Sequence, residues 1–408
     1  MMNSKTATYH LYKCSMKRIS PFLYLLFFSA TNAFSQRADA INMASTVFHL
    51  YPDSMVTKGS VRPANWNYEI GVTMMGMWGL WEKTGDSVYI KYVKKIVDHF
   101  VTAEGNIRTY DLTDYNADHI LSGRLVLRLY DAYKDLKYKK AADLLRKQID
   151  WQPRNRVGGF WHKLKYPAQM WLDGLYMIEP YYAEYTKRFG SKEVYADIVH
   201  EFVLMEQKAR DPITGLIYHG WDESRQQFWA DKQTGLSQSF WSRAMGWYHV
   251  ALVEVLDVMD ANHPERKKML GILNRLTIAI LKVQDKDSGV WWQITDKAGA
   301  EKNYLESSAS AMFVYALARS VNKGYISPAY RKTVEKGYAG LLKEFVVKDA
   351  EGRTHFTKTV AVGGLGGSPN RNGTYAYYMS EPIRSDDFKG IGPFMLAALE
   401  LEQLNAKK

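Results

Sequence analysis

The residues best suited to chemistry lie in one short stretch, GGFWHKLKYPAQMWLDGLYM, from Gly158 to Met177. Its single carboxylate, Asp173, stands where an apolar helix is expected to begin, and His162 and Trp171 lie close to it in the sequence. Such an acid can simply cap the helix, because it accepts backbone N–H groups and suits the positive end of the helix dipole. A carboxylate among aromatic rings and an imidazole is also typical of a catalytic cleft for a sugar. The stretch alone leaves these two interpretations even.

A second carboxylate, Asp118, lies in the polar and aromatic segment YNADHI, where another helix is expected to begin. General acid–base chemistry on a sugar requires one carboxyl group that is partly protonated near neutral pH, and burial or a neighbouring carboxylate favours that state. Asp173 among tryptophans, with Asp118 nearby, is expected to meet this requirement. Asp118 could instead only cap its helix, which is the commoner use of such a residue.

Other side chains suit the binding of a charged sugar. His162 and His219 each follow an aromatic residue in a separate loop, although a lone histidine more often stabilises the loop that carries it. Arg243 lies in FWSRAMGW between Trp241 and Trp247. Its guanidinium could hold a carboxylate through two hydrogen bonds, or it could form a buried structural ion pair.

Metal and nucleotide chemistry are not indicated. The sequence contains no HExxH, no CxxC and no clustered ligand spacing, so we expect no metal and no cofactor. It also lacks the phosphate-binding pattern GxxxxGK[ST]. The glycine-rich run GGLGGSPNRNGTY, residues 363–375, is expected to form a long mobile loop over the cleft.

Helices arranged in pairs must position these residues, because helical periodicity dominates the chain. In each pair, a helix rich in small and apolar residues precedes a more charged, amphipathic one. The first helices are predicted to begin near Tyr68, Asn116, Trp171, Trp241, Glu306 and Asp387. The partners are predicted at residues 87–100, 139–148, 193–208, 265–284 and 329–345, with residues 38–50 as the sixth.

Six such pairs predict an all-α fold, an (α/α)6 barrel formed by one domain over residues 36–408. An open helical solenoid is the alternative, but a solenoid keeps a stricter repeat length than the spacing found here. Glycine–aromatic loops predict short β-excursions over one end of the barrel. The cleft at that end is expected to be walled by Trp161, Trp171, Trp221, Trp241, Trp247 and Trp292.

Residues 1–35 are predicted to be a signal peptide. A basic segment precedes the short apolar run PFLYLLFFSA, and small residues follow at the positions that a signal peptidase reads. Met16 offers an alternative start, since a complete signal follows it. We therefore expect export, with the periplasm favoured, and no membrane attachment after cleavage. Cys14, the only cysteine, would leave with the peptide, so the mature chain would have no disulfide and no thiolate chemistry.

Charge and composition narrow the class of partner. The formal net charge of +11 favours anionic partners, but no long basic run of the kind found in nucleic-acid-binding proteins is present. The 12 tryptophans and 28 tyrosines suit stacking on sugar rings, although large helical cores also use them. These features exclude nucleic acid as the expected partner and favour an acidic carbohydrate.

Several segments, taken in order, resemble one family across nearly the whole mature chain. They are NWNYEIGV, YNADHI, GGFWHK with QMWLDGLYM, GLIYHGWDES, FWSRAMGWYHVAL, ESSASAMF and DFKGIGPF. The chain resembles glycoside hydrolase family 105, the unsaturated rhamnogalacturonyl hydrolases, and more weakly the unsaturated glucuronyl hydrolases of family 88. The resemblance implies an (α/α)6 barrel. It also implies hydrolysis of oligosaccharides that end in a 4,5-unsaturated uronic acid, with protonation at C4 and addition of water at C5.

The resemblance also implies roles for individual residues. Asp173 matches the general acid–base, and Asp118 matches a second essential carboxylate that would position the sugar hydroxyls. The substrate-contacting positions of the family match Tyr68, His162, Trp171, His219, Arg243 and Trp247, and Trp241 is added from its place beside Arg243. The assignment of the uronate carboxylate to Arg243 is our inference from charge.

Two other functions are compatible with the same residues. A sugar epimerase or isomerase of this barrel type would use paired histidines to move protons and would break no glycosidic bond. A carbohydrate-binding scaffold would bind oligosaccharides without turnover. Within the hydrolase hypothesis, a galacturonyl or a glucuronyl origin of the sugar stays open, because the lyase removes the C4 centre at which they differ. The aglycone and the oligomeric state stay open as well.

Overall fold

The computed structural model describes residues 21–56, 63–367 and 370–407, with side chains described from residue 36 onward. Six inner helices form a closed ring, because each packs against the next and the last packs against the first. In ring order they are α2 (Tyr68–Thr84), α4 (Gly123–Tyr133), α6 (Leu172–Phe189), α8 (Ser242–Val258), α10 (Ser307–Lys323) and α13 (Phe388–Ala406).

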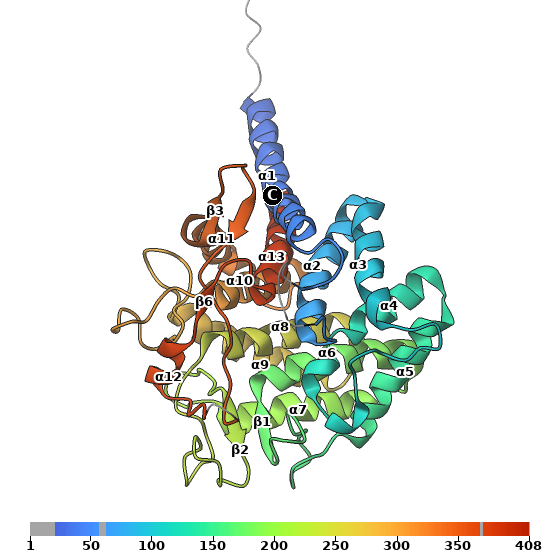
Figure 1. Cartoon of the computed structure of the whole chain (residues 1–408). Coiled ribbons are helices and arrows are strands. Elements are labelled where there is room, and N and C mark those ends of the chain that lie inside the picture. The colour runs from blue at the N-terminus through green and yellow to red at the C-terminus, as the bar shows by residue number, and fades with distance from the viewer. Residues whose placement is uncertain (1–20, 57–62, 368–369, 408) are drawn as a thin grey trace, which may run out of the picture.

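An outer helix packs against each inner helix (Figure 1). In the order of their inner partners from α2 to α13, the outer helices are α3 (Ser87–Phe100), α5 (Leu136–Trp151), α7 (Val194–Ala209), α9 (Arg266–Lys282), α11 (Arg331–Phe345) and α1 (Pro21–Leu50). The predicted (α/α)6 barrel is therefore confirmed. So is the closure of the ring by an N-terminal helix, which packs against α13 at the other end of the chain.

Local sequence signals explain where these helices begin. Asn67 caps α2 by accepting a hydrogen bond of 2.9 Å from the backbone N–H of Glu69, and Asp86 caps α3 in the same way. Small residues allow the inner helices to approach one another closely. A Cβ atom on Gly392 of α13 would lie 2.2 Å from the carbonyl oxygen of Val72 on α2, so the α2–α13 contact requires glycine.

The loops contain the β-structure, as predicted. Strand β1 (Gln169–Trp171) pairs with β2 (Gly220–Asp222), β3 (Val346–Lys348) with β4 (Thr354–Phe356), and β5 (Thr359–Val360) with β6 (Ile383–Arg384), all antiparallel. The loops also contain the short helices η1 (Leu112–Asp114), η2 (Ala117–His119), η3 (Pro328–Tyr330) and α12 (Tyr375–Ser380).

One predicted helix begins later than expected. The sequence places its start near Asn116, but Asn116 instead caps η2, where its side chain accepts a hydrogen bond of 3.1 Å from the backbone of Asp118. Helix α4 begins only at Gly123. An asparagine can cap a short turn or begin a long helix, and the two cases look alike in the sequence. The predicted start near Asn116 was therefore too early.

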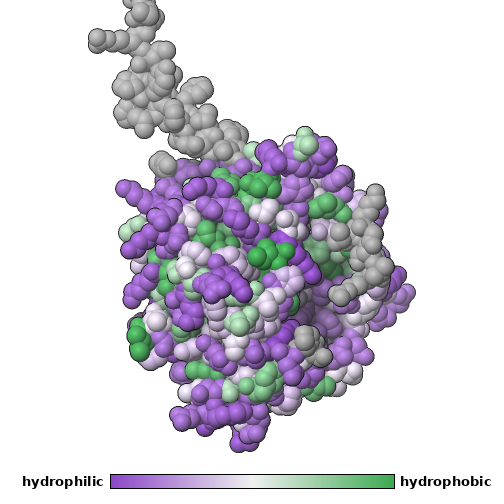
Figure 2. Space-filling model, turned by 60° about the vertical axis from the view of Figure 1, so that its left-hand side comes forward, coloured by the Kyte–Doolittle hydropathy of each residue, from purple (hydrophilic) through white to green (hydrophobic). Residues whose placement is uncertain are grey.

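Part of the predicted signal peptide, residues 1–20, lies outside the described residues, and residues 21–35 are described only as the backbone of α1. Within the described ranges, no helix is both long and apolar enough to cross a membrane. Figure 2 shows a largely hydrophilic face on which hydrophobic residues are scattered in small groups.

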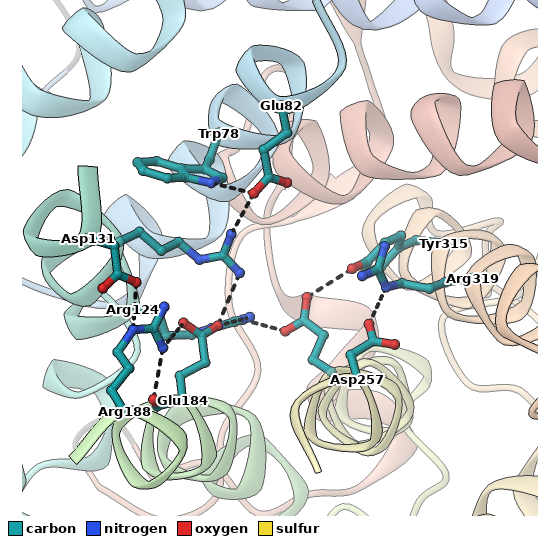
Figure 3. A network of polar contacts seen from close by, with 11 residues as sticks. Trp78, Glu82, Arg124, Asp131, Glu184, Arg188, Asp257, Tyr315 and Arg319 are labelled. Carbon is teal, nitrogen blue, oxygen red and sulfur yellow. Dashed lines mark hydrogen bonds and ion pairs between the residues drawn. The ribbon is translucent and has the colours of Figure 1, made fainter. Parts of the chain in front are cut away.

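Charged residues of the inner helices form a network of ion pairs and hydrogen bonds (Figure 3). Arg124 of α4 is almost fully buried and forms ion pairs with Glu184 of α6, at 2.8 Å, and with Glu254 of α8. Tyr315 of α10 donates a hydrogen bond of 3.0 Å to Glu254. One arginine thus joins two carboxylates that belong to neighbouring inner helices.

The same network reaches the remaining inner helices and lines a cavity of about 310 Å³. Arg128 of α4 contacts Glu82 of α2 at 3.5 Å, and Arg319 of α10 contacts Glu400 of α13 at 2.5 Å. Every inner helix therefore contributes at least one member. The charged residues that line this cavity are paired with one another, so we interpret the cavity as a structural part of the barrel. The candidate active site lies at the opposite end.

Candidate active site

The N-termini of the inner helices gather at one end of the barrel, because every inner helix runs in the same direction around the ring. Asp118 lies in η2 just before α4, Asp173 in the first turn of α6, and Arg243 in the first turn of α8. The barrel thus brings to one end three residues that are far apart in the sequence.

Asp173 lies beside His219. Its Oδ2 atom is 3.0 Å from Nε2 of His219, although the two atoms are not aligned as a hydrogen bond in this structure. Poor alignment without substrate is common in active sites. The backbone fixes the pair, because the N–H of Leu172 donates a hydrogen bond of 3.0 Å to the carbonyl oxygen of His219. Trp171 occupies the N-cap position, so the capping interpretation of Asp173 is not what the structure shows.

Tyr378 of α12 completes this side of the site. Its hydroxyl lies 2.7 Å from Nδ1 of His219, and both side chains are fully buried. Sequence reasoning did not single out Tyr378, because it lies 159 positions from His219. A tyrosine in a short, tyrosine-rich segment carries no local signal of such a contact.

Asp118 forms an ion pair with Lys163, and its Oδ1 atom lies 3.6 Å from Nε2 of His162. Burial opposes the charge of Asp118, but Lys163 and His162 together lower its pKa. Burial lowers the pKa of His162 to about 4, despite the nearby carboxylate of Asp118. At neutral pH this side of the site therefore holds an ionised aspartate and a neutral imidazole. Lys163 was missed as well, although it adjoins His162 in the sequence.

Trp171 contacts the histidine of each carboxylate–histidine pair. Its ring stacks on His162 at 4.5 Å and on Tyr166 at 4.9 Å, and it meets His219 edge-on at 5.6 Å. Strand pairing sets this orientation, because β1 places Trp171 opposite Gly220 of β2, where a side chain would contact the Trp171 ring. The result is an aromatic platform that contacts both histidines, with His162 stacked on the ring and His219 at its edge.

A second aromatic group surrounds Trp247. Its ring stacks on Tyr176 at 5.0 Å and meets Tyr68 edge-on at 6.1 Å. Burial and the nearby carboxylates of Glu69 and Asp118 raise the pKa of Tyr68, which therefore stays protonated and can donate a hydrogen bond. Tyr68 thus lies within electrostatic reach of the Asp118 side of the site.

Arg243 is buried without a carboxylate partner among the described residues. It donates hydrogen bonds to the carbonyl oxygen of Val360, at 2.5 Å, and to the Ser308 hydroxyl, at 3.4 Å, and it lies over the Trp241 ring. The buried ion pair that was the alternative is therefore not observed. Trp241 also contacts His219, at 4.7 Å between ring centres, which connects Arg243 to the Asp173 side of the site.

Of the six tryptophans expected to wall the cleft, Trp171, Trp241 and Trp247 contact other residues of the candidate site, whereas the other three point elsewhere. Trp221 alternates with Gly220 in β2, so it points away from Trp171 and contacts Lys208 of the outer helix α7. The Trp292 indole donates a hydrogen bond to Asp285, in the loop after α9, and so points towards that loop. Trp161 alternates with His162 and lines a separate hollow together with residues 154–156 and 223–225. Neighbouring side chains in these segments can point to opposite faces, which a count of aromatic residues does not resolve.

The described part of the glycine-rich loop packs against the platform. Leu365 is buried in a cluster with Tyr166, Trp171 and Trp229. Arg371 donates hydrogen bonds of 3.0 Å to the Tyr166 hydroxyl and 2.9 Å to the carbonyl oxygen of Gly366. The loop therefore lies over the Trp171 side of the site, as expected.

Metal ligands are not assembled in the part of the chain that the structure describes, where no group of three or more His, Cys, Asp or Glu side chains could hold an ion. What the site offers is two carboxylates, two imidazoles, a guanidinium free of carboxylates and several aromatic rings. This set can bind an anionic sugar and move protons to and from it.

Comparison with known proteins agrees with this architecture. The model of Glycosyl Hydrolase Family 88 matches residues 40–405. A solved glycoside hydrolase of family 105 from Clostridium acetobutylicum ATCC 824 superimposes with a TM-score of 0.85 at 42% identity, over 89% of this chain and 99% of that one. The solved unsaturated glucuronyl hydrolase of Bacillus sp. GL1 is 16% identical, with a TM-score of 0.64 over 90% and 96% of the two chains, and shares the fold.

Curated relatives point to the same group. The unsaturated rhamnogalacturonyl hydrolase YesR of Bacillus subtilis (strain 168) is 28% identical over 68% of this chain and 75% of its own length. Protein Atu3128 of Agrobacterium fabrum is 36% identical over 54% of this chain and 96% of its own length. The chain therefore belongs to Glycosyl Hydrolase Family 88, is similar to the solved enzymes of family 105, and is a glycoside hydrolase.

Proposed function

We propose that this enzyme releases the terminal 4,5-unsaturated uronic acid from oligosaccharides made by polysaccharide lyases. The supporting observation is the arrangement around Trp171, whose ring contacts both His162, which faces Asp118, and His219, which lies beside Asp173. Among the described residues, Arg243 lies beside Trp241 without a carboxylate partner. The substrate would supply the carboxylate that Arg243 lacks.

The reaction needs one group that both donates and accepts a proton, and we assign this role to Asp173. The protonated carboxyl donates its proton to C4 of the double bond, and positive charge develops at C5, where the ring oxygen stabilises it. Water then adds at C5 and returns a proton to Asp173. The hemiketal opens as its bond to the ring oxygen breaks, and the aglycone leaves as an alcohol. The net change is the consumption of water, and no attack at the anomeric carbon is required.

The other residues bind and orient the sugar. Asp118 is ionised and would accept hydrogen bonds from sugar hydroxyls, while Lys163 keeps it charged. Trp171 and Trp247 provide aromatic faces, and Arg243 would hold the uronate carboxylate with its free guanidinium edge. Tyr68, His162, His219 and Trp241 border the same space and complete the set of proposed contacts.

A pectic substrate with rhamnose as aglycone is the first choice. The Bacillus subtilis relative is an unsaturated rhamnogalacturonyl hydrolase, whereas an Alteromonas relative that is 24% identical is an unsaturated 3S-rhamnoglycuronyl hydrolase. Both names contain an unsaturated uronide and rhamnose. Digests of several pectic and gum polysaccharides by lyases, tested in parallel, would identify the preferred sugar.

The test is the ultraviolet absorbance of the conjugated double bond in such digests. Wild-type enzyme should remove it and release a free aglycone, whereas an isomerase would leave the glycosidic bond intact. Asp173→Asn should lower kcat by about 10²–10⁴-fold, because the amide cannot transfer the proton. The matched control is Asp131→Asn, a half-exposed partner of Arg188 in the charged network. If Asp173→Asn keeps near-normal turnover, the proton transfer belongs to another residue.

We also propose that the enzyme is exported and loses residues 1–35. Contacts that attach α1 to the barrel lie beyond this point, because Arg37 pairs with Glu402 and Asp39 accepts a hydrogen bond from Tyr338. Removal of the peptide would leave these contacts in place. N-terminal sequencing of protein from the periplasmic fraction should begin at Gln36. Intact residues 1–35 on the active enzyme would contradict the proposal.

A further inference from the structure

A small cavity lies behind His162, on the side away from Asp118. It has a volume of about 10 Å³, close to the space that one water molecule needs. The segment at residues 160–162, strand β1 and one face of α6 enclose it, together with Glu201 of α7. On α6, Gly174 and Glu179 belong to this face, and a Cβ atom on Gly174 would lie 3.0 Å from Nδ1 of His162.

Three residues that line this cavity carry a buried polar atom without a hydrogen-bond partner among the described residues. These atoms are the indole Nε1 of Trp161, Nδ1 of His162 and Oε2 of Glu179. A buried polar atom that stays unpaired costs about 1–3 kcal/mol. Three such atoms around a space of this size are what one internal water needs, because buried waters make two to four hydrogen bonds.

Asp118 favours a proton on Nε2 of His162. Nε2 of His162 faces the ionised carboxylate of Asp118, so a neutral imidazole carries its single proton on Nε2. Nδ1 is then an acceptor that requires a donor from the cavity side. Carboxylates and amides behind a histidine commonly select its tautomer in this way.

Glu179 can act as a donor because it is neutral. Burial and the neighbouring carboxylate of Glu201 raise its pKa well above the usual value. Glu201 accepts hydrogen bonds of 3.0 and 3.2 Å from the backbone N–H of Phe160. Other charged or titratable groups also act on these residues. The Glu179–Glu201 pair lies near Asp197 and Arg154. His162 lies near Asp118, Lys163, Asp173 and His219.

We propose that one internal water joins the Trp161 indole N–H, Nδ1 of His162 and the protonated carboxyl of Glu179. The water accepts from the indole and from Glu179, and it donates to Nδ1. Glu179 is therefore a positioning residue that acts through the water and holds His162 as the Nε2–H tautomer. The geometry of this site rests on its own contacts. Only its effect on turnover rests on the proposed function.

The first measurement is made without substrate. In the nitrogen-15 NMR spectrum of histidine-labelled enzyme at neutral pH, His162 should show one neutral tautomer with the proton on Nε2. Glu179→Gln should keep this signal, because the amide still donates. Glu179→Met removes the donor at similar volume and should give a mixture of tautomers. An unchanged His162 signal in Glu179→Met overturns the proposal.

The second measurement is turnover. Glu179→Met should lower kcat/KM by about tenfold or more, as do outer partners of functional histidines in metal sites, whereas Glu179→Gln should stay near wild type. The control is Glu184→Gln, on the same helix and equally buried but within the charged network. It should lower stability without moving the His162 signal. An equal change of that signal in Glu184→Gln would contradict the assignment.

The two measurements distinguish a failure of the proposed function from a failure of the role of Glu179. An enzyme that is inactive on every lyase digest but shows the predicted NMR changes would refute the proposed function and leave the role of Glu179 intact. Activity with no tautomer change in Glu179→Met would refute the role of Glu179 alone.

Discussion

At the scale of single residues, the site depends on side chains whose protonation is set by neighbours rather than by their own type. His162 and His219 are both buried beside an aspartate, yet they have different second partners. His219 meets the Tyr378 hydroxyl at 2.7 Å, whereas Nδ1 of His162 has no direct partner in the part of the chain that the structure describes. The two histidines are therefore not equivalent. Their surroundings do not favour an epimerase or isomerase in which paired histidines move protons.

Removal of the Tyr378 hydroxyl tests the His219 side. Tyr378→Phe keeps the ring that stacks on Trp241 but leaves Nδ1 of His219 without its partner. We expect kcat/KM to fall roughly tenfold and stability to fall by about 1 kcal/mol, the usual worth of one hydrogen bond. Steady-state kinetics and denaturant unfolding measure the two quantities. A loss of stability without a change in kcat/KM would assign Tyr378 to packing alone.

The pH dependence of stability tests the buried state of His162. Its pKa is about 4 in the folded enzyme, against about 6.5 for an unperturbed histidine. Between these values the unfolded chain binds a proton that the folded enzyme does not, so stability is present above about pH 6.5 and is lost as the pH falls towards 4. This histidine should contribute roughly 3 kcal/mol to that loss. The His162→Gln variant should show a smaller decrease in unfolding free energy over this range, and equal slopes would refute the prediction.

At the scale of elements, the N-terminal end of an inner helix carries site residues, whereas the rest of the helix packs in the barrel. Helix α6 shows both demands, because Asp173 and Gly174 lie in its first turn while Glu184 lies in the charged network near its other end. Gly174 is less favourable for helix stability than alanine. Because it has no side chain, it leaves room for the His162 ring.

Gly174→Ala should therefore separate stability from activity. Alanine favours a helix by up to about 1 kcal/mol over glycine, so stability should hold or rise. The new Cβ atom would lie 3.0 Å from Nδ1 of His162 and displace the ring, so kcat/KM should fall. The control is Gly271→Ala in α9, where the nearest atom is the flexible end of Arg275. It should stabilise the protein without loss of activity. Equal activity of both variants would show that His162 tolerates the shift.

At the scale of the whole molecule, the two ends of the barrel use charge differently. Among the described residues, one end leaves Arg243 without a carboxylate, whereas the other pairs arginines with carboxylates across all the inner helices. The paired charges fix the arrangement of the helices, and a guanidinium without a carboxylate is where an anionic ligand gains most.

Disruption of the charged network should destabilise the fold without changing the chemistry. Arg124→Met removes the arginine that pairs with the buried Glu254 and one of the three arginines that pair with Glu184, which should cost about 3–5 kcal/mol. The matched change Arg275→Met removes the partner of Glu206 in a pair whose arginine is half-exposed and should cost less than about 1 kcal/mol. Denaturant unfolding compares the two. Similar costs would mean that the network does not hold the ring together.

The sequence by itself determined the helices, their pairing and the closure of the ring. Periodicity and capping are local properties, so the predicted starts at Tyr68, Trp171, Trp241, Glu306 and Asp387 lie within one residue of the observed helices. The same local patterns placed Asp118, Asp173 and Arg243 at one end. The chemical roles of these three residues stay predictions.

Only the tertiary structure decided which side chains meet across the loops. The contact of Tyr378 with His219, the pairing of Lys163 with Asp118 and the cavity between His162 and Glu179 depend on how irregular segments cross the end of the barrel. Such segments have no repeating period that links sequence distance to direction. A residue in a loop can therefore point into the site or away from it, as His162 and Trp161 do from adjacent positions.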